Sequence, residues 1–276
     1  MSGIILSILI PAYNFPNGIR RILERLEYNS ETEIVIFDNS DNLNILQLID
    51  RFKKKFNNQI VYKSFNATNA VQNWNNLIKF SNGNFYILLH HDELLLLNTT
   101  MSNFVNYLKN TESSLLIFKC ILKKRFLKLH FPIFLSKFLV KRFPIYLLKR
   151  NFLGPTACLV IKKDVFYELY DENLKWLVDV DFYYRLFLNK NIKFEFSNLA
   201  NIYSFQDNTE SITNKLKLNF NTTYKFETKF IIKKYNFTSI FYLYKFDFIL
   251  WFLFKIIFLP FSFLISLNSQ KNNDHW

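Results

Sequence analysis

The chain has 276 residues, among them 33 Phe and 15 Tyr, and a formal net charge of +13. This length suffices for one large α/β domain or two small ones, so size excludes neither architecture. The two cysteines, Cys120 and Cys158, lie inside apolar runs, which favours two small buried side chains over a disulfide or a metal pair.

The first half of the chain alternates strand and helix patterns. Apolar runs predict strands at Ile4–Pro11, Glu33–Phe37, Ile60–Phe65 and Phe85–Leu89. Apolar residues at helical spacing predict helices between them, with stripes over Ile19–Leu26, Ile45–Phe56 and Ala70–Leu77. Short buried strands that alternate with amphipathic helices predict a mostly parallel sheet with right-handed crossovers.

Polar residues follow three of these strands. They are Ala12–Asn14 after the first, Asp38–Asp41 after the second and His90–Glu93 after the fourth. Ligands of such sheets bind beyond the carboxyl ends of the strands, so we expect the three clusters to share one crevice. We predict that His90–Glu93 is a loop, because four polar groups cannot enter a core unpaired.

The second half of the chain is less regular. The pattern predicts a helix over Met101–Leu108 and a strand over Leu115–Leu122. It then predicts a Gly-Pro turn that feeds a strand ending near Lys162, and a helix capped by Asp164. Within Leu174–Leu188, apolar residues at helical spacing predict one more helix, which Asp179 opens.

Two segments differ in composition from the rest of the chain: the first is both basic and apolar, and the second is strongly apolar. Ten Lys and Arg residues alternate with Phe, Leu and Ile in the insertion at about 119–150, and no acidic residue lies between Glu112 and Asp164. The tail, 236–276, is dominated by Phe, Leu and Ile. Its uncharged stretch Ile256–Asn268 is shorter than the ~20 residues that a membrane-crossing helix needs, so we expect the tail to lie in the membrane interface.

The basic segment suits two partners, nucleic acid and an anionic membrane surface. The apolar tail is unsuited to nucleic-acid contact, so we predict membrane association and no nucleic-acid partner. A solvated insertion with a few helices is the alternative for 119–150. No strong targeting segment precedes Ile4, so we expect a cytoplasmic protein, peripheral on the inner face of the cell membrane.

Four motifs in order resemble those of the family 2 glycosyltransferases. They are SILIPAYN at 7–14, EIVIFDNSDN at 33–42, AVQNWNNLIKFSNGNFYILLHHDELL at 70–95 and WLVDVDFYYRL at 176–186. The resemblance implies an α/β fold of the GT-A (Rossmann-like) type over residues 1–235, with a nucleotide-sugar-binding half at 1–100 and an acceptor half at 101–235. It also implies inverting transfer, of a hexosyl or related unit, from a nucleotide diphosphate sugar to a glycan or polyprenyl-linked saccharide acceptor, as in members that build surface polysaccharides.

The resemblance also assigns the donor site. Asp92 corresponds to the last acid of an Asp-x-Asp motif, which binds Mn²⁺ or Mg²⁺ on the donor diphosphate. Such an ion neutralises the charge of the leaving group. The residues assigned to the nucleotide sugar are Pro11, Ala12, Tyr13, Asn14, Asp38, Asn73, His90 and His91.

The sequence departs from the family pattern at two places. His90 stands where the first acid of the motif usually stands, and the late histidine of many members is replaced by Gln206 or Asp207. Both departures favour the alternative of a degenerate homologue that binds a nucleotide sugar or a glycan at the membrane without turnover. A solvated turn or helix cap without ligand is the alternative for His90–Glu93.

An inverting transfer needs a base for the acceptor hydroxyl, and by resemblance this base is Asp179. Asp181 is the second choice. Helix capping is the alternative for Asp179, because acids at helix starts stabilise the free N–H groups there. Arg185 is expected either to form a surface ion pair with Asp181 or to line the crevice. The Gly154–Thr156 segment is either the floor of the acceptor site or a plain turn.

Overall fold

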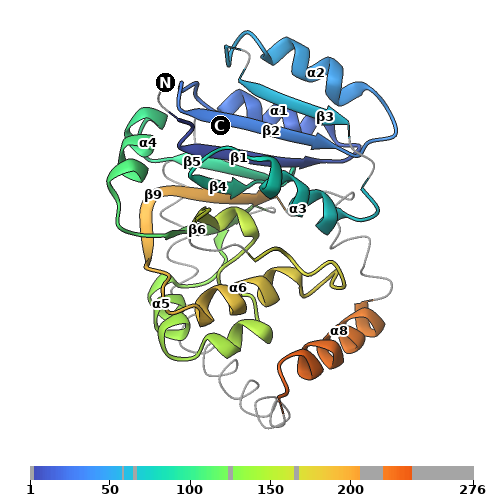
Figure 1. The fold of residues 1–276 in the computed structure, drawn as a ribbon, viewed down its shortest axis with the longest axis vertical. Coiled ribbons are helices and arrows are strands. Elements are labelled where there is room, and N and C mark those ends of the chain that lie inside the picture. The colour runs from blue at the N-terminus through green and yellow to red at the C-terminus, as the bar shows by residue number, and fades with distance from the viewer. Residues whose placement is uncertain are drawn as a thin grey trace.

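The computed structural model describes residues 3–57, 59–64, 67–123, 127–164, 168–205 and 220–237. Nine strands of this described part form one sheet, in the order β3-β2-β1-β4-β8-β6-β9-β5, with β7 paired to β6 (Figure 1). The strands are β1 (Leu6–Ala12), β2 (Thr32–Asp38), β3 (Ile60–Ser64), β4 (Phe85–Leu88), β5 (Glu93–Leu97), β6 (Leu115–Lys123), β7 (Leu127–Leu129), β8 (Leu159–Lys162) and β9 (Phe194–Phe205).

The N-terminal half follows the prediction. Strands β3, β2, β1 and β4 are parallel, and every residue of β1 and β2 is buried, which accounts for their continuous apolar runs. The connecting helices are α1 (Pro16–Arg25), α2 (Asn44–Phe52) and α3 (Ala70–Phe80). The register pairs Ala12 with Asp38, so the polar clusters that follow β1 and β2 lie side by side.

The C-terminal half makes the sheet mixed rather than mostly parallel. Pairs β4–β8, β8–β6 and β9–β5 are antiparallel, and β6–β9 is parallel. In a flat sheet about 19 Å would separate β4 from β5, more than the ~17 Å that the five steps from Leu88 to Glu93 can span. The sheet is therefore curled, which brings β5 against α1.

Helices cover both faces of the sheet. Alternate residues of β1 point to opposite faces, with Ile8 and Ile10 in one apolar cluster and Leu9 in the other. The first cluster includes residues of α1, α2 and α4 (Met101–Asn110), and the second includes residues of α3 and α6 (Val178–Leu188). The other helical segments are α5 (Ile133–Arg142), α8 (Phe220–Lys234) and the 3-10 turns η1 (Pro144–Leu148) and η2 (Thr156–Cys158).

Some predictions differ from the structure or are not tested by it. The helix after Asp164 is wrong, because residues 163–164 form a turn and the described residues 168–177 contain no helix. Strand β5 was not expected, because Glu93 was assigned to a loop. Gln206, Asp207 and the tail beyond Phe237 lie outside the described residues, so the predicted division at 235 stays a prediction. Over the described ranges, no helix has both the length and the apolar character needed to cross a bilayer.

Candidate active site

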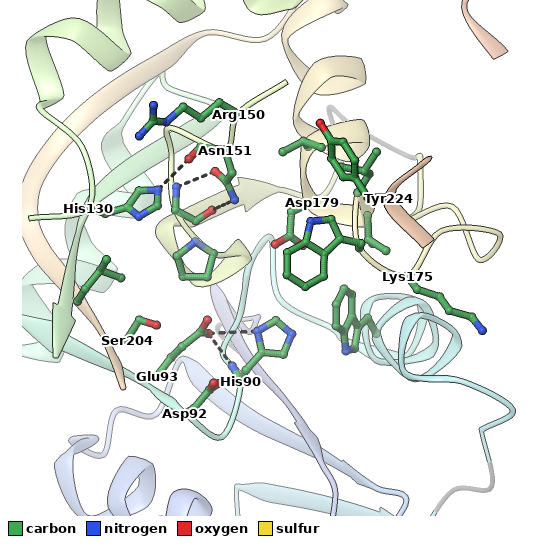
Figure 2. A pocket seen from close by; sticks show the side chains of 18 of the residues that line it. His90, Asp92, Glu93, His130, Arg150, Asn151, Lys175, Asp179, Ser204 and Tyr224 are labelled. Atoms are coloured by element: carbon green, nitrogen blue, oxygen red, sulfur yellow. Dashed lines mark hydrogen bonds and ion pairs between the residues drawn. The ribbon is translucent and has the colours of Figure 1, made fainter. Parts of the chain in front are cut away.

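A cavity of about 470 Å³ lies between the loop after β4 and the N-terminus of α6. Asp92 and Asp179, which are far apart in the sequence, both line it. Figure 2 shows the Asp179 side chain entering the cavity from α6, above the loop that carries His90 and Asp92 and leads to Glu93 of β5. The loop residues His90 and His91 line the same cavity, and so do Gly154 and Pro155, whereas Thr156 does not; their role as the floor of an acceptor site stays a prediction.

His90 is held by Glu93, three residues later in the chain. Its backbone N–H and its ring Nδ1 both donate to Oε2 of Glu93, at 2.8 and 3.2 Å. Burial opposes the charged form, but Glu93, Asp92 and Asp179 outweigh it and raise the pKa of His90 to about 9. Ring Nε2 is buried and has no hydrogen-bond partner in the part of the chain described. It can donate to an anionic ligand in the cavity.

The loop prediction for His90–Glu93 is wrong at its last residue, Glu93. It is the first residue of β5 and only 3% exposed, so a carboxylate does enter the interior. It is tolerated there because His90 donates two hydrogen bonds to it. The ring of His90 in turn packs on Trp74, with 4.8 Å between the ring centroids. Trp74 is therefore both a core residue and part of the cavity wall.

Asp92 is the cavity carboxyl suited to a cation. Burial, followed by the neighbouring Glu93, raises its pKa above the ordinary value, against the opposing effect of His90 and His91. No three His, Cys, Asp or Glu side chains within the described ranges gather closely enough to enclose a metal ion. Mg²⁺ in phosphate sites takes one or two carboxylates and completes its shell with phosphate oxygens and water. Asp92 fits an ion of that kind, and an all-protein metal cage does not fit these residues.

Asp179 lies in the first turn of α6, as predicted. Its carboxylate accepts no hydrogen bond from the described residues, so it does not cap the helix. Burial raises its pKa to about 6, with Glu93 adding to the shift and His90 opposing it. The group is ionised at neutral pH and can still take up a proton, as a general base must.

Asp181 is not available as a second base. It is fully buried and accepts hydrogen bonds from Arg185 Nε at 3.0 Å, Lys234 Nζ at 2.9 Å and Tyr235 Oη at 2.7 Å. The predicted pair between Asp181 and Arg185 is thus present, but it is a buried pair rather than a surface pair. Residues two apart on a helix point in different directions, which separates Asp179 from Asp181.

The other residues predicted to bind the donor sugar nucleotide do not line the cavity but form a group beside it, the donor group: Pro11, Ala12, Tyr13, Asn14, Asp38 and Asn73. Pro11 and Ala12 are buried at the end of β1, and Tyr13 is 38% exposed. Asn14 has a φ of 46°, a left-handed conformation that asparagine tolerates, and its N–H donates to Ser40 Oγ at 2.7 Å. These contacts join the loop after β1 to the loop after β2.

Asp38 and Asn73 complete this adjoining group. Asp38 is 2% exposed, and its carboxylate accepts from the Ser40 N–H and from the Tyr62 hydroxyl, both at 2.9 Å. Asn73 donates to the Phe37 carbonyl at 3.1 Å, and its Oδ1 is buried without a partner among the described residues. The group reaches the cavity through Phe15, whose ring centroid lies 5.3 Å from that of His91.

Several cavity residues were not anticipated. Ser204 comes from β9, Tyr224 from α8, and Lys175 and Trp176 from the segment before α6. Lys149 and Arg150 belong to the basic insertion, and their charge was the one signal in the sequence that marked them. No motif marks Ser204 or Tyr224, because only the tertiary packing of β9 and α8 brings them to this wall.

Comparison with known proteins gives a family and a fold. Residues 7–169, more than half of the chain, match the model of "Glycosyl transferase family 2". The crystal structure of S. aureus TarS 1-349 with UDP-GlcNAc has a TM-score of 0.55 at 16% identity, over 76% of this chain and 60% of that one. The complex of the same fragment with UDP has a TM-score of 0.53 at 17% identity, over 73% and 60%.

These similarities have clear bounds. At such identities the likeness to TarS shows the fold alone, and the chain spans less than two thirds of that fragment. No curated protein matches the chain. The family match ends at residue 169, before α6 and Asp179. The inclusion of α6 and Asp179 in the candidate site is therefore based on the geometry of the cavity and not on the family match.

Proposed function

Because this chain belongs to glycosyl transferase family 2, we propose that it is an inverting glycosyltransferase. It moves a hexosyl or related sugar from a nucleotide diphosphate sugar to a glycan or lipid-linked saccharide, in surface polysaccharide synthesis. The observation that carries this proposal is the shared cavity of Asp92 and Asp179. One carboxylate stands where a leaving diphosphate needs a cation, and the other is an unpaired base near neutrality.

The proposed reaction uses both ends of the cavity. Asp179 accepts the proton of the acceptor hydroxyl as its oxygen attacks the anomeric carbon, and the bond from that carbon to the diphosphate oxygen breaks on the opposite face. His90 Nε2–H donates to the diphosphate as its charge develops. Asp92 would hold Mn²⁺ or Mg²⁺, which neutralises that charge when bound.

The nucleotide is assigned to the group beside the cavity. The register of β1 and β2 places Ala12 next to Asp38, so both loops face one ligand. The exposed ring of Tyr13 offers a surface for a base to stack on. The Asn73 Oδ1 atom offers an acceptor to a base N–H. Since both oxygens of Asp38 already bond within the protein, Asp38 supports the loop as well as the base.

A donor panel tests the proposal. We expect one nucleotide diphosphate sugar to raise the melting temperature, and its slow hydrolysis to require Mn²⁺ or Mg²⁺. A saccharide acceptor should convert that hydrolysis into transfer with inverted anomeric configuration. The alternative is a homologue that binds the donor without turnover, and His90 in place of an acid favours it. Tight donor binding with no turnover under any metal or acceptor would establish that alternative.

We also propose that the protein lies on an anionic membrane surface through α5, on the cytoplasmic face. Three aromatic side chains on and after this helix are exposed, at 61%, 53% and 46% for Phe134, Phe138 and Phe143. The cations exposed with them are Lys137, Lys141 and Arg142. Rings of this kind enter the headgroup boundary and the cations meet lipid phosphates, which matches a helix with no acidic residue.

The position of α5 also supports a lipid-linked acceptor. Figure 1 shows α5 at the end of the molecule away from β1–β3. The 3-10 turn η1 follows it directly, and the next residues, Lys149 and Arg150, line the cavity. A bilayer under α5 therefore lies on the acceptor side, so a polyprenyl-linked saccharide anchored in it can approach Asp179.

The double substitution Phe134→Ser and Phe138→Ser should weaken binding to vesicles of phosphatidylcholine with phosphatidylglycerol by about tenfold, because two apolar side chains no longer enter the headgroup boundary of the membrane. Co-sedimentation measures this. Wild type should bind vesicles of phosphatidylcholine alone much less, and donor hydrolysis should be unchanged in the variant. Tyr28→Ser, which removes an exposed ring from the connection between α1 and β2, is the control. Undiminished binding of the double variant would exclude α5 as the contact.

A further inference from the structure

Glu227 of α8 is a buried carboxylate that holds the segment before α6. It is 2% exposed. Its Oε1 accepts from the N–H groups of Lys175 and Trp176 at 2.8 and 3.2 Å, and its Oε2 accepts from those of Trp176 and Leu177 at 3.0 and 2.8 Å. Each oxygen therefore has two donors, which offsets the cost of burying the charge.

These N–H groups belong to the three residues that lead into α6, the last of which, Leu177, directly precedes the helix. The residue before the helix, Leu177, provides no side-chain cap. A helix N-terminus has free N–H groups and a positive dipole end, and an anion there is stabilising. Glu227 places an anion beside this end of α6 from another helix, while its hydrogen bonds hold the backbone of the three residues before the first turn. The contact therefore fixes the entry to α6, and Asp179 lies two residues after the last bonded residue, Leu177.

A second contact fixes α6 further along. Lys234 and Tyr235 at the end of α8 bind the carboxylate of Asp181 at 2.7–3.0 Å. Between the two contacts, Ile231 is buried in the apolar cluster that includes α6. Figure 1 shows α8 running beside the N-terminal part of α6. Two attachments on either side of Asp179 set both the position and the rotation of the turn that carries it.

We infer that Glu227 is a positioning residue for the transfer reaction, which rests on the proposed function. It holds residues 175–177 so that Asp179 faces His90 across the cavity. Lys175, Trp176 and Leu177 also line the cavity, as does Tyr224 from the same helix, so α8 shapes the acceptor side. Among the described residues, no hydrogen bond joins Glu227 to the donor group at the ends of β1 and β2. Loss of Glu227 should therefore impair the chemical step and acceptor use while donor binding is kept.

The test compares Glu227→Gln and Glu227→Ala in the full chain with Lys229→Gln, which removes a charge from an exposed position of the same helix. The amide nitrogen of Gln cannot accept an N–H, so this nearly isosteric change removes the bonds of one oxygen. We expect kcat for transfer to fall about 10- to 100-fold, because small misplacements of reacting groups have effects of that size. The Kd of the donor nucleotide should change less than about twofold.

The outcomes separate a positioning role from a structural one. Assays well below the melting temperature of each variant exclude a simple loss of folded protein, and Glu227→Gln serves where the alanine variant does not fold. Equal losses in donor affinity and kcat, or kcat equal to that of Lys229→Gln, would overturn the inference while the transferase function stands. Absence of transfer by wild type with every donor and acceptor would instead reject the proposed function, and the positioning role with it.

Discussion

Asp179→Asn should lower kcat for sugar transfer by about 10²- to 10⁴-fold, the range that general-base catalysis contributes. Asparagine keeps the size of the side chain but cannot take the acceptor proton. Donor affinity should be retained, because the residues proposed to bind the nucleotide lie at the ends of β1 and β2. Steady-state transfer assays and nucleotide titration measure the two quantities. Asp50→Asn, an exposed acid on α2, is the control. Full activity in Asp179→Asn would remove Asp179 from its role.

The Asp179 carboxyl also predicts how kcat and the stability of the fold depend on pH. The pKa of Asp179 is raised to about 6 by burial and Glu93, with His90 opposing, so kcat should fall on the acidic side with a midpoint near 6. The raised pKa means that the folded state binds this proton more tightly than the unfolded state. At pH 7 the ionised group then destabilises the fold, and asparagine should stabilise it by about 1–3 kcal/mol. The gain should vanish below pH 4, where the carboxyl is protonated in both states.

Asp92→Asn should lower kcat/KM by about 10²-fold or more and remove any stimulation by Mn²⁺ or Mg²⁺. At the donor end the Glu93 carboxylate accepts two hydrogen bonds from His90, which leaves Asp92 as the acid that can bind a cation there. Activity measured against metal concentration, and after chelation, tests this. The wild type should respond to the metal, and the variant should not.

The opposite result would assign the diphosphate to His90. If wild type keeps its activity after chelation and Asp92→Asn is as active as wild type, no metal serves the leaving group. The imidazolium of His90 then supplies the cation, because its Nε2–H is directed at no described partner. His90→Gln would in that case be the more damaging change.

Much of the N-terminal half could be predicted because its information is local. Each parallel strand is an apolar run, each helix has an apolar stripe, and the polar residues of the site follow strand ends directly. Asp179 lines the cavity and Asp181 is buried away from it, which also follows from helix geometry, because residues two apart on a helix point in different directions. The wrong helix at Asp164 shows the limit of such patterns, since a capping residue does not make a helix without packing to support it.

The features that were missed depend on long-range contacts. Strand β5 is defined by pairing with β9, about a hundred residues later, and no pattern in Glu93–Leu97 specifies that partner. Glu227 contacts residues 50 or more positions earlier. Nothing in the sequence of α8 distinguishes a glutamate that binds the backbone before another helix from one that faces solvent. The curl of the sheet is likewise a consequence of strand order.

The short connection from β4 to the edge strand β5 limits how this site can vary. It contains a tight turn at residues 91–92, closed by the Glu93 N–H, which donates to the His90 carbonyl at 3.0 Å. Helix α1 packs so closely on this turn that a Cβ at Gly18 would lie 2.2 Å from the His91 carbonyl. Removing or adding one residue would break this turn and shift the Asp92 carboxylate, and the close packing of α1 leaves no room for a larger turn. Substitution is the tolerated kind of variation at these positions, and a histidine in the place of an acid is one such change.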